Sequence, residues 1–443
     1  MKKRYILFLV LLFALLGCGT DYILSSFYLR KDFDWLKPAS EQANLNDDQF
    51  VMSGYDFNKN NSPVVLATKD NYMLIIYEYR GSANNSLIGV NGSQTVNISI
   101  AISKNAYSFT VDNRIVGDEG LSPTKSHGAP VVFLNTDNSI VVLSTTGNPG
   151  YGTGGTADDI TKLSYSISTN NGYAWTDWVD IDTNVFKPLI DKGYKRFYTN
   201  PGNGLTLKNG ALVCMVDYKS VGSSKSQGAA IIYSVNGGKD WQLGATMEYI
   251  GSASGKRFAR VVAERQDGSL LIAAVHDTSS GSDEFNDNGP LYWAFLPNLQ
   301  NGGVIRDLQV SGLPNNSGGS VSVDRIKFTH NNQLFNCLVI AHTTPDRIYK
   351  HPQLGDQQVK NALTISISKD EGTNWTLIKN DFGVPANKTT FRQSLKVLKD
   401  GSITVVNEEP NALSITSALG YDIIYRRFGL AAISGGEYSY EGL

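Results

Sequence analysis

The sequence has 443 residues, of which 41% are hydrophobic, 10% aromatic and 18% charged, as expected for a folded chain of two or three ordinary domains or one large closed domain. Its 39 Lys and Arg nearly balance 41 Asp and Glu, and the net charge of −2 provides no basic surface for nucleic acid, so no nucleic-acid partner is expected. With 43 Gly and 22 Tyr against 5 Met, the composition favours short strands and turns and excludes an all-α fold.

The N-terminal segment has the pattern of an export signal. Basic residues 2–4 precede an apolar run over residues 5–16, which is too short to cross a bilayer as a stable helix. The run ends at a glycine followed by Cys18, which resembles the lipobox of bacterial lipoproteins and implies lipidation of Cys18. An ordinary signal peptide with an incidental cysteine is the alternative. We expect residues 1–17 to be a signal peptide and residues 18–47 a lipidated tether that anchors the protein in the bacterial cell envelope, facing the periplasm or the exterior.

One motif recurs through the rest of the chain. Its pattern is S-x-[DN]-x-G-x-x-W, and complete copies begin at Ser168, Ser234 and Ser368. The starts lie 66 and then 134 residues apart, which fits one period with a decayed copy near residue 301, and a degenerate copy begins at Ser103. Each copy follows an alternating strand pattern, so we expect a hairpin turn. Gly would supply a positive φ, the Asn or Asp oxygen would accept hydrogen bonds from turn amides, and Trp would pack under the hairpin.

The period of this motif predicts the fold. Roughly 400 residues follow the tether, which corresponds to about six units. Six four-stranded sheets around one axis close into an all-β, six-bladed β-propeller, which leaves few exposed strand edges, and we expect this propeller over residues 48–443. A β-sandwich with coincidental motifs is the alternative, which three copies in one register disfavour. Cys214 and Cys337 lie in apolar runs of different units and are expected to be buried free thiols.

The motif resembles the Asp box of the sialidase superfamily, whose members are BNR-repeat propellers. Several strand patterns also resemble that family's blades, and they occur in the family's order at residues 63–80, 128–143, 201–213, 261–272 and 394–403. The resemblance covers most of the chain, from about residue 55 to about residue 410. It identifies the chain as a member of the superfamily and implies the propeller fold.

The resemblance also implies a site for sialic acid. The anomeric carbon of this sugar carries a carboxylate, so the family uses a Tyr nucleophile that a Glu deprotonates, an Asp as acid and base, and three Arg that clamp the substrate carboxylate. Glu264 matches the family's glutamate and is the expected catalytic residue. Arg80 matches an arginine that lines the family's pocket, so we expect it to bind substrate. The alternative for each is an exposed residue near a strand end.

The other positions depart from the family pattern. Asn61 stands where the first clamp arginine is expected, residues 273–276 lack the second, and Lys360 lies near the third. The loop over residues 81–92 has no aspartate to act as acid and base. Arg392 occupies the position of the nucleophilic tyrosine, and a guanidinium that stays protonated cannot replace it. Arg392 and Lys360 are therefore expected to bind an acidic substrate rather than to attack it.

Closure of the propeller is expected to bring Glu264 and Arg392 together as an ion pair at the centre. Further arginines near the matched strands are Arg196, Arg257 and Arg260, and candidate rings for sugar stacking are Tyr198, Phe258 and Phe391. The loop over residues 277–290 carries Asp283, Glu284 and Asp287 but lacks EF-hand spacing, which favours a solvated loop over a calcium site. No metal or other cofactor is expected.

Two functions remain open at this point. The first is an exo-sialidase-like glycoside hydrolase that acts on terminal sialylated or other acidic glycans, with Glu264 as its carboxylate and a displaced nucleophile. The second is a non-hydrolytic surface lectin or adhesin in which Arg392 holds the anion. The resemblance favours the first function and the residue chemistry favours the second. The expected partners are glycans, and a membrane through the lipid anchor.

Overall fold

Strands dominate the computed structural model of the chain, which describes residues 46–52, 59–80, 95–120, 122–147, 149–151, 156, 158–223, 226–249, 256–276, 291–299, 303, 305, 309–310, 313, 321–344, 347–351, 355–359, 362–379, 391–410 and 421–440. Contacts divide the chain into residues 1–36 and 37–443, and every described residue lies in the second unit. The predicted lipidation site Cys18 and the predicted ligand residue Lys360 lie outside the described residues. No helix in the described ranges is long and apolar enough to cross a membrane.

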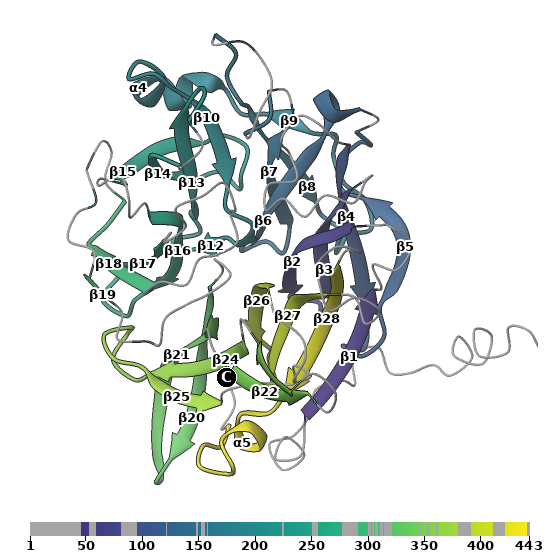
Figure 1. Cartoon of the computed structure of the whole chain (residues 1–443), viewed down its shortest axis with the longest axis vertical. Coiled ribbons are helices and arrows are strands. Elements are labelled where there is room, and N and C mark those ends of the chain that lie inside the picture. The colour runs from purple at the N-terminus through teal and green to yellow at the C-terminus, as the bar shows by residue number, and fades with distance from the viewer. Residues whose placement is uncertain are drawn as a thin grey trace, which may run out of the picture. The chain divides into compact units, whose positions relative to one another are not determined.

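The strands form six sheets that are arranged as the blades of a β-propeller (Figure 1). Blade 1 contains β2 (Lys59–Ala67), β3 (Met73–Arg80), β4 (Val96–Ser103) and β5 (Thr110–Ile115). Blade 2 contains β6 (His127–Leu134), β7 (Ile140–Thr146), β8 (Leu163–Ser168) and β9 (Val179–Asp180), and β11 (Gly202–Asn203) pairs with β6 in parallel. Blade 3 contains β10 (Tyr194–Thr199), β13 (Leu212–Ser220), β14 (Gly228–Ser234) and β15 (Gln242–Glu248), and β12 (Leu205–Thr206) also pairs with β13. The predicted six-bladed, all-β fold is confirmed.

The remaining blades have the same order of strands. Blade 4 contains β16 (Lys256–Glu264), β17 (Leu270–His276), β18 (Leu291–Leu296) and β19 (Gln309–Val310). Blade 5 contains β20 (Ser322–His330), β21 (Gln333–Thr344), β24 (Ala362–Ser368) and β25 (Thr376–Lys379), with the separate hairpin β22 (Arg347–His351) and β23 (Gly355–Val359). Blade 6 contains β26 (Phe391–Val397), β27 (Ile403–Pro410) and β28 (Tyr421–Phe428), and it is completed by β1 (Asn46–Met52). Short helical turns occur at η1 (Pro123–Lys125), η2 (Thr183–Phe186), α4 (Lys187–Ile190) and α5 (Leu430–Ile433).

Blade 6 joins the two ends of the propeller. Strand β1 pairs antiparallel with β28, with Asn46 opposite Phe428 and Asp48 opposite Arg426, and Figure 1 shows the purple β1 beside the yellow β28. The first strand of the chain is therefore the outer strand of the last blade. It begins within the segment 18–47 that the sequence pattern predicts to be a tether.

Neighbouring blades pack against each other through the buried side chains on both faces of their strands. All seven residues of β7 are buried, and β-branched side chains dominate such strands because they fit a pleated surface packed on both sides. One buried cluster, for example, joins Val213 and Ile231 of blade 3 to Val261 and Ile272 of blade 4. The predicted buried free thiols Cys214 and Cys337 are confirmed, and each lies in such a cluster.

The repeated motif forms the turn between the third and fourth strands of its blade, as predicted. In the copy that follows β8, the Asn170 side-chain oxygen accepts a hydrogen bond from the Ala174 amide at 2.8 Å. Gly172 has φ +84° there, and the Trp175 indole donates to the Gly172 carbonyl at 3.0 Å. The copies after β14 and β24 repeat the amide cap, through Asn236 and Asp370 respectively.

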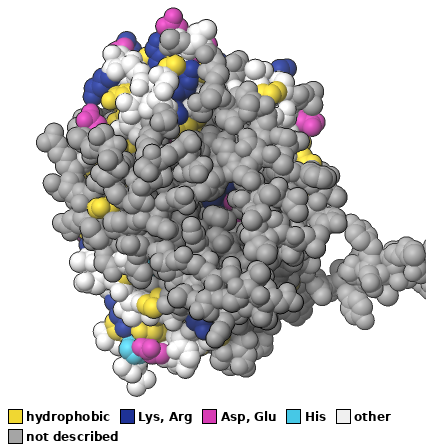
Figure 2. All heavy atoms as spheres, viewed as in Figure 1, with side chains coloured by type: hydrophobic (Ala, Val, Ile, Leu, Met, Phe, Trp, Pro, Cys, Tyr) yellow, Lys and Arg dark blue, Asp and Glu magenta, His cyan; other side chains and the backbone are white. Residues whose placement is uncertain are grey.

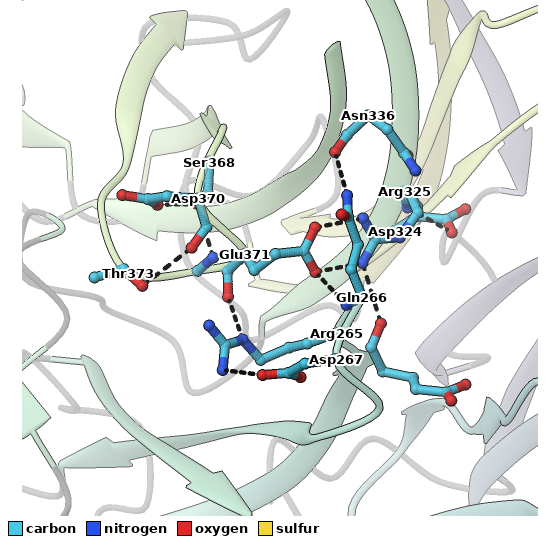
Figure 3. Close-up of polar contacts among 12 residues, drawn as sticks. Arg265, Gln266, Asp267, Asp324, Arg325, Asn336, Ser368, Asp370, Glu371 and Thr373 are labelled. Atoms are coloured by element: carbon cyan, nitrogen blue, oxygen red, sulfur yellow. Dashed lines mark hydrogen bonds and ion pairs between the residues drawn. The ribbon is translucent and has the colours of Figure 1, made fainter. Parts of the chain in front are cut away.

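Each of these turns also contacts the first hairpin of the preceding blade. The Asn171 amide of blade 2 donates to Asp70 of blade 1 at 3.0 Å, and in blade 5 the Glu371 carbonyl accepts from Arg265 of blade 4 at 3.0 Å. Figure 3 shows Glu371 facing Arg325 while its backbone meets Arg265. The motif therefore connects neighbouring blades as well as closing its own hairpin.

The innermost strands of the blades run in the same direction around the hub, the central axis of the propeller. Hydrogen bonds between neighbouring inner strands show which residues lie at the same height along the axis. Leu395 N donates to Ser322 Oγ at 2.9 Å, and Val397 N donates to Asp324 Oδ2 at 2.8 Å. Two arginine side chains also reach a neighbouring strand: Arg260 Nη1 donates to Val321 O at 3.2 Å, and Arg325 Nη2 donates to Glu264 O at 3.1 Å. The hub therefore has a strand-start end, where the inner strands begin, and a turn end, where they lead into hairpin turns.

Candidate functional site

The strand-start end of the hub contains a buried cluster of polar and charged side chains. Its members come from the first residues of inner strands and from the ends of the strands that pair with them, for example Arg392 of β26 and Glu408 of β27. Near the middle of the face shown in Figure 2 is a hollow in which side chains of Lys or Arg and of Asp or Glu are visible.

Arg392 is the centre of the cluster, at the start of β26. Its Nη1 donates to Asn61 Oδ1 and to Glu408 Oε1, both at 2.9 Å, and its exposed fraction is 6%. Glu408 Oε1 also accepts from the backbone amide of Ser62. The side chains of Asn61, Ser62 and Glu408 are buried, so blades 1 and 6 share one charged network.

The backbone conformation at these strand starts is unusual and repeated. Ser62, Ala129 and Arg392 have φ values of 53°, 54° and 34°, and each lies at an irregularity in the pairing of its inner strand. Left-handed backbone at a non-glycine residue costs free energy and is kept only where surrounding contacts hold it. Here the bulge turns amides toward carboxylates, because Ser62 N donates to Glu408 and Ala129 N donates to Glu78.

The carboxylates of the cluster occupy one repeated position. Glu78, Asp217 and Glu408 each stand seven residues after a positive-φ residue of the preceding hairpin turn, at 71, 210 and 401. All three side chains are buried. The sequence pattern contained this signal, since these acids follow apolar strands at a fixed distance from the turn, yet the family resemblance did not single them out.

Several buried atoms of the Arg392 network have no hydrogen-bond partner within the described part of the chain. They are Asn61 Nδ2, Ser62 Oγ and Glu408 Oε2. Buried polar atoms are nearly always satisfied by protein, water or ligand, because leaving one unpaired costs about 1–3 kcal/mol. This end of the hub therefore offers a donor, a hydroxyl and a carboxylate acceptor within one network.

Asp217 and Tyr249 form the corresponding contact between blades 3 and 4. The Tyr249 hydroxyl donates to Asp217 Oδ1 at 3.0 Å and accepts from the Ala259 amide at 3.3 Å, and Asn200 Nδ2 also donates to Asp217 at 2.9 Å. Burial, followed by the charge of Asp217, raises the pKa of Tyr249 well above its usual value. The phenol therefore stays protonated and is a hydrogen-bond donor, not a nucleophile.

Arg260 crosses the hub just below Arg392. It is 8% exposed, and its Nη atoms donate to the backbone carbonyls of Pro201 and Val321 on either side. Its Nε has no hydrogen-bond partner in the described ranges. Burial, together with a smaller effect of the nearby charge of Arg392, lowers the pKa of Arg260 to about 10 against the opposing effects of Tyr198 and Asp217. At neutral pH it is still a cation.

Glu264 lies at the other end of the hub, so the expected ion pair with Arg392 is wrong. Glu264 is the last residue of β16, level with Arg325, whereas Arg392 is near the first residue of β26. Counted from the equivalent turns at Gly268 and Gly401, the two residues are five positions apart in height, or roughly 17 Å. The Glu264 carboxylate accepts from the Lys208 amide at 2.7 Å and is 16% exposed, while the carboxylate that meets Arg392 is Glu408.

The other predicted residues lie in different places. Arg80 is fully buried and bound to Glu78 at 2.6 Å, which excludes an exposed strand end. Arg196 donates to the Asp159 carbonyl at 2.5 Å. Tyr198 is 2% exposed and packs against Tyr151, so its ring is part of the core and offers no face to a sugar in this conformation. Several residues lie outside the described side chains: Arg257, Phe258, Asp283, Glu284, Asp287, Lys360 and Phe391.

The cluster can bind charge and hydroxyl groups, but it presents Arg392 where a tyrosine nucleophile is expected. Among the described residues, no three side chains of His, Cys, Asp or Glu are grouped so that they could hold a metal ion. The groups that the cluster presents are guanidinium, carboxylate and amide. Such a set recognises a polar ligand through hydrogen bonds and charge.

A model of one protein family matches more than half of the chain. It is the BNR repeat-like domain, and the match covers residues 46–299. No sequence among the curated proteins matches this one significantly.

Solved structures share the propeller fold at low sequence identity. A protein of unknown function from Dyadobacter fermentans is 13% identical, with a TM-score of 0.59 over 86% of this chain and 97% of that one. The intramolecular trans-sialidase from Ruminococcus gnavus, in complex with oseltamivir carboxylate, is 13% identical, with a TM-score of 0.59 over 88% and 98% of the two chains. The sialidase of Trypanosoma rangeli, in complex with the inhibitor DANA, is 13% identical with a TM-score of 0.61 over 85% of this chain, but the match spans only 56% of that protein. At these identities the similarity establishes the fold alone.

Proposed function

Because this chain belongs to the BNR repeat-like domain family and has the propeller fold of the sialidases, we propose that it binds terminal acidic sugars of glycans at the strand-start end of the hub without hydrolysing them. The observation that carries this proposal is the Arg392 network. It combines a guanidinium with a buried donor, hydroxyl and carboxylate oxygen that lack partners among the residues that the structure describes.

The chemistry of these groups fits a hydroxylated ring that bears an anion. Glu408 Oε2 accepts hydrogen bonds, so it needs a donor such as a sugar hydroxyl. Asn61 Nδ2 donates and Ser62 Oγ does either, so both can satisfy hydroxyl or carboxylate oxygens of a ligand. The positive charge of Arg392 favours an acidic sugar over a neutral one.

The same position argues against sialidase-type hydrolysis. The resemblance places Arg392 where the family's nucleophilic tyrosine stands, and a guanidinium has no oxygen with which to attack an anomeric carbon. Glu264, which the resemblance suggests as the catalytic glutamate, lies at the turn end of the hub, away from this network. The proposal therefore assigns Glu264 no part in ligand binding.

Two measurements on the purified protein test this function. In the first, a fluorogenic sialoside should show no release above the buffer rate. In the second, the protein should be retained on a sialylated glycan column more strongly than on the same glycan without sialic acid. Release of sialic acid by the native protein would establish a hydrolase and overturn the non-hydrolytic assignment.

Substitution of Arg392 tests the position of the site. We expect Arg392→Gln to weaken binding of the sialylated glycan at least tenfold and to change binding of the neutral glycan little, because only the charged group loses its partner. The matched controls Arg265→Gln and Glu264→Gln, both at the turn end, should leave retention unchanged. Equal loss for both glycans in Arg392→Gln would contradict the anion-binding role.

We also propose that the protein is a lipoprotein of the bacterial cell envelope, held by an acylated Cys18. The support is the basic, apolar and glycine-cysteine order of residues 2–18. The native chain should incorporate radiolabelled palmitate and partition with membranes, whereas Cys18→Ser should do neither. Palmitate incorporation that persists in Cys18→Ser would contradict this anchor.

A further inference from the structure

A cavity of about 260 Å³ lies within the hub, toward the turn end from the Arg392 network. Its lining comes from the inner strands of all six blades, and its apolar wall includes Leu66, Val132, Leu134, Val323 and Leu395. The hydrogen bonds between inner strands place Arg260 at one end of this lining, and Asp324 lies three residue positions further along the axis. Three residues of extended strand span roughly 10 Å, so the cavity is elongated and apolar, with a polar group at each end.

The inner end of the cavity is formed by Arg260 together with Asn203. The Arg260 guanidinium lies against the backbone of Gly202, where a Cβ atom would be 2.4 Å from Nη1. Its contacts are with two carbonyl oxygens, and no carboxylate lies within ion-pair distance among the described residues. Asp217 is close enough to raise the pKa of Arg260, but its carboxylate accepts hydrogen bonds from Asn200 and Tyr249 and forms no direct ion pair with Arg260. A buried cation without a direct ion pair is unfavourable, so this end of the cavity favours an anion.

The outer end of the cavity differs, because its charges already compensate each other. Lys396 Nζ lies 2.8 Å from Asp324 Oδ2, and the two side chains are 32% and 20% exposed. The solvent-facing end is therefore neutral overall, and among the described residues of the lining Arg260 is the charged side chain without a direct ion pair. A ligand that fits both features has one negative group and an apolar body.

The volume limits the ligand to a small molecule. An apolar cavity of about 150 Å³ is known to hold benzene, so the present cavity has room for a ligand of about ten heavy atoms. We propose that the hub cavity binds a small organic carboxylate, whose anionic group pairs with Arg260 and whose apolar body lies between Leu66, Leu134 and Val323. This site is separate from the glycan site proposed above and does not depend on it.

Benzoate and benzyl alcohol provide matched probes, since they share a ring and differ in charge. Saturation-transfer NMR and calorimetry on the purified full chain should show benzoate binding at least tenfold more tightly than benzyl alcohol. Absence of benzoate binding to the native protein would overturn the proposal. Equal affinities for the two probes would also overturn it, because the cavity would then select for an apolar ring and not for an anion.

Cavity filling tests the location without removing the charge. Val323→Trp should abolish benzoate binding, whereas Val235→Trp, at a position with 66% exposure, should bind as the native protein does. Retained benzoate binding in a folded Val323→Trp would contradict the assigned cavity. Retention on the sialylated column should be unchanged in Val323→Trp, so failure of this proposal and failure of the glycan site can be distinguished.

Discussion

Three buried acids, Glu78, Asp217 and Glu408, occupy one repeated position of the blades and connect neighbouring blades at the hub. Glu78 and Glu408 accept hydrogen bonds from amides at the strand start of the next blade, and Asp217 does so through the hydroxyl of Tyr249. These contacts stabilise left-handed backbone at Ser62 and Ala129, which would otherwise be strained. The same carboxylates that hold the blades in place therefore also shape the proposed glycan site.

A single buried histidine makes the stability of the folded protein depend on pH. His342 is fully buried, and burial lowers its pKa from 6.5 to about 4. The pKa of His342 is lower in the folded state than in the unfolded state. The free energy of unfolding is therefore highest above pH 6.5 and falls by on the order of 3 kcal/mol as the pH decreases toward 4. Denaturant unfolding at pH 7 and pH 4.5 should show this loss.

The matched variant for this prediction is His342→Gln, which cannot titrate in that range. The drop in stability between the two pH values should be smaller in His342→Gln than in the native chain. A residual drop is expected, because burial also lowers the pKa of His127 to about 4. An unchanged pH dependence in His342→Gln would contradict the assignment to this residue.

The sequence contained the information needed to place Glu264 and Arg392, although the resemblance obscured it. Glu264 stands four residues before Gly268 of its turn, whereas Arg392 stands nine residues before Gly401 of its own. Because the inner strands are parallel, such different distances from the turn mean opposite ends of the hub. The partner of Arg392 could not be predicted in this way, since its contacts with Asn61 and Glu408 depend on closure of the whole ring.

At the scale of elements, the recurring turn motif links one blade to the next. In blade 5, Glu371 binds Arg325 through both carboxylate oxygens at 2.7 Å (Figure 3). Arg325 also donates to the Glu264 carbonyl of blade 4. The Glu371 side chain is 15% exposed. This partly buried, two-oxygen contact is therefore expected to contribute more than a surface ion pair.

A double-mutant cycle measures this link between elements. Combining Arg325→Gln with Glu371→Gln should give a coupling of about 1–2 kcal/mol in the free energy of unfolding. The exposed pair Lys187 and Asp191 is the matched control, and its coupling should be no more than about 0.5 kcal/mol. Equal couplings for the two pairs would contradict a special role for the motif.

Elements with a local pattern were predictable, and elements defined by a distant partner were not. The alternating pattern before the motif copy at Ser168 predicted a strand, and the structure has β8 at Leu163–Ser168. In contrast, nothing local shows that Asn46–Met52 pairs with Tyr421–Phe428. The parallel strand β11 at the hub depends in the same way on its partner β6. Pairing of this kind is set by tertiary packing.

At the scale of the whole molecule, the antiparallel pair of β1 and β28 closes the ring. A chain that begins at Asn44 keeps β1, whereas one that begins at Gly54 lacks it and leaves β28 as an unpaired edge. We expect the longer chain to unfold cooperatively and the shorter one to melt on the order of 10 °C lower or to aggregate. Equal melting temperatures and solubilities would show that the closure is not required.

The closing strand also has a consequence for biosynthesis. A ribosome makes β1 before any other strand of the propeller and β28 after all the others, so the earliest strand waits for its partner until translation is almost complete. Until then β1 has no partner strand, and a nascent or prematurely terminated chain exposes its unpaired edge to its neighbours. Chaperone protection during synthesis is thus needed most by the part of the protein that is made first.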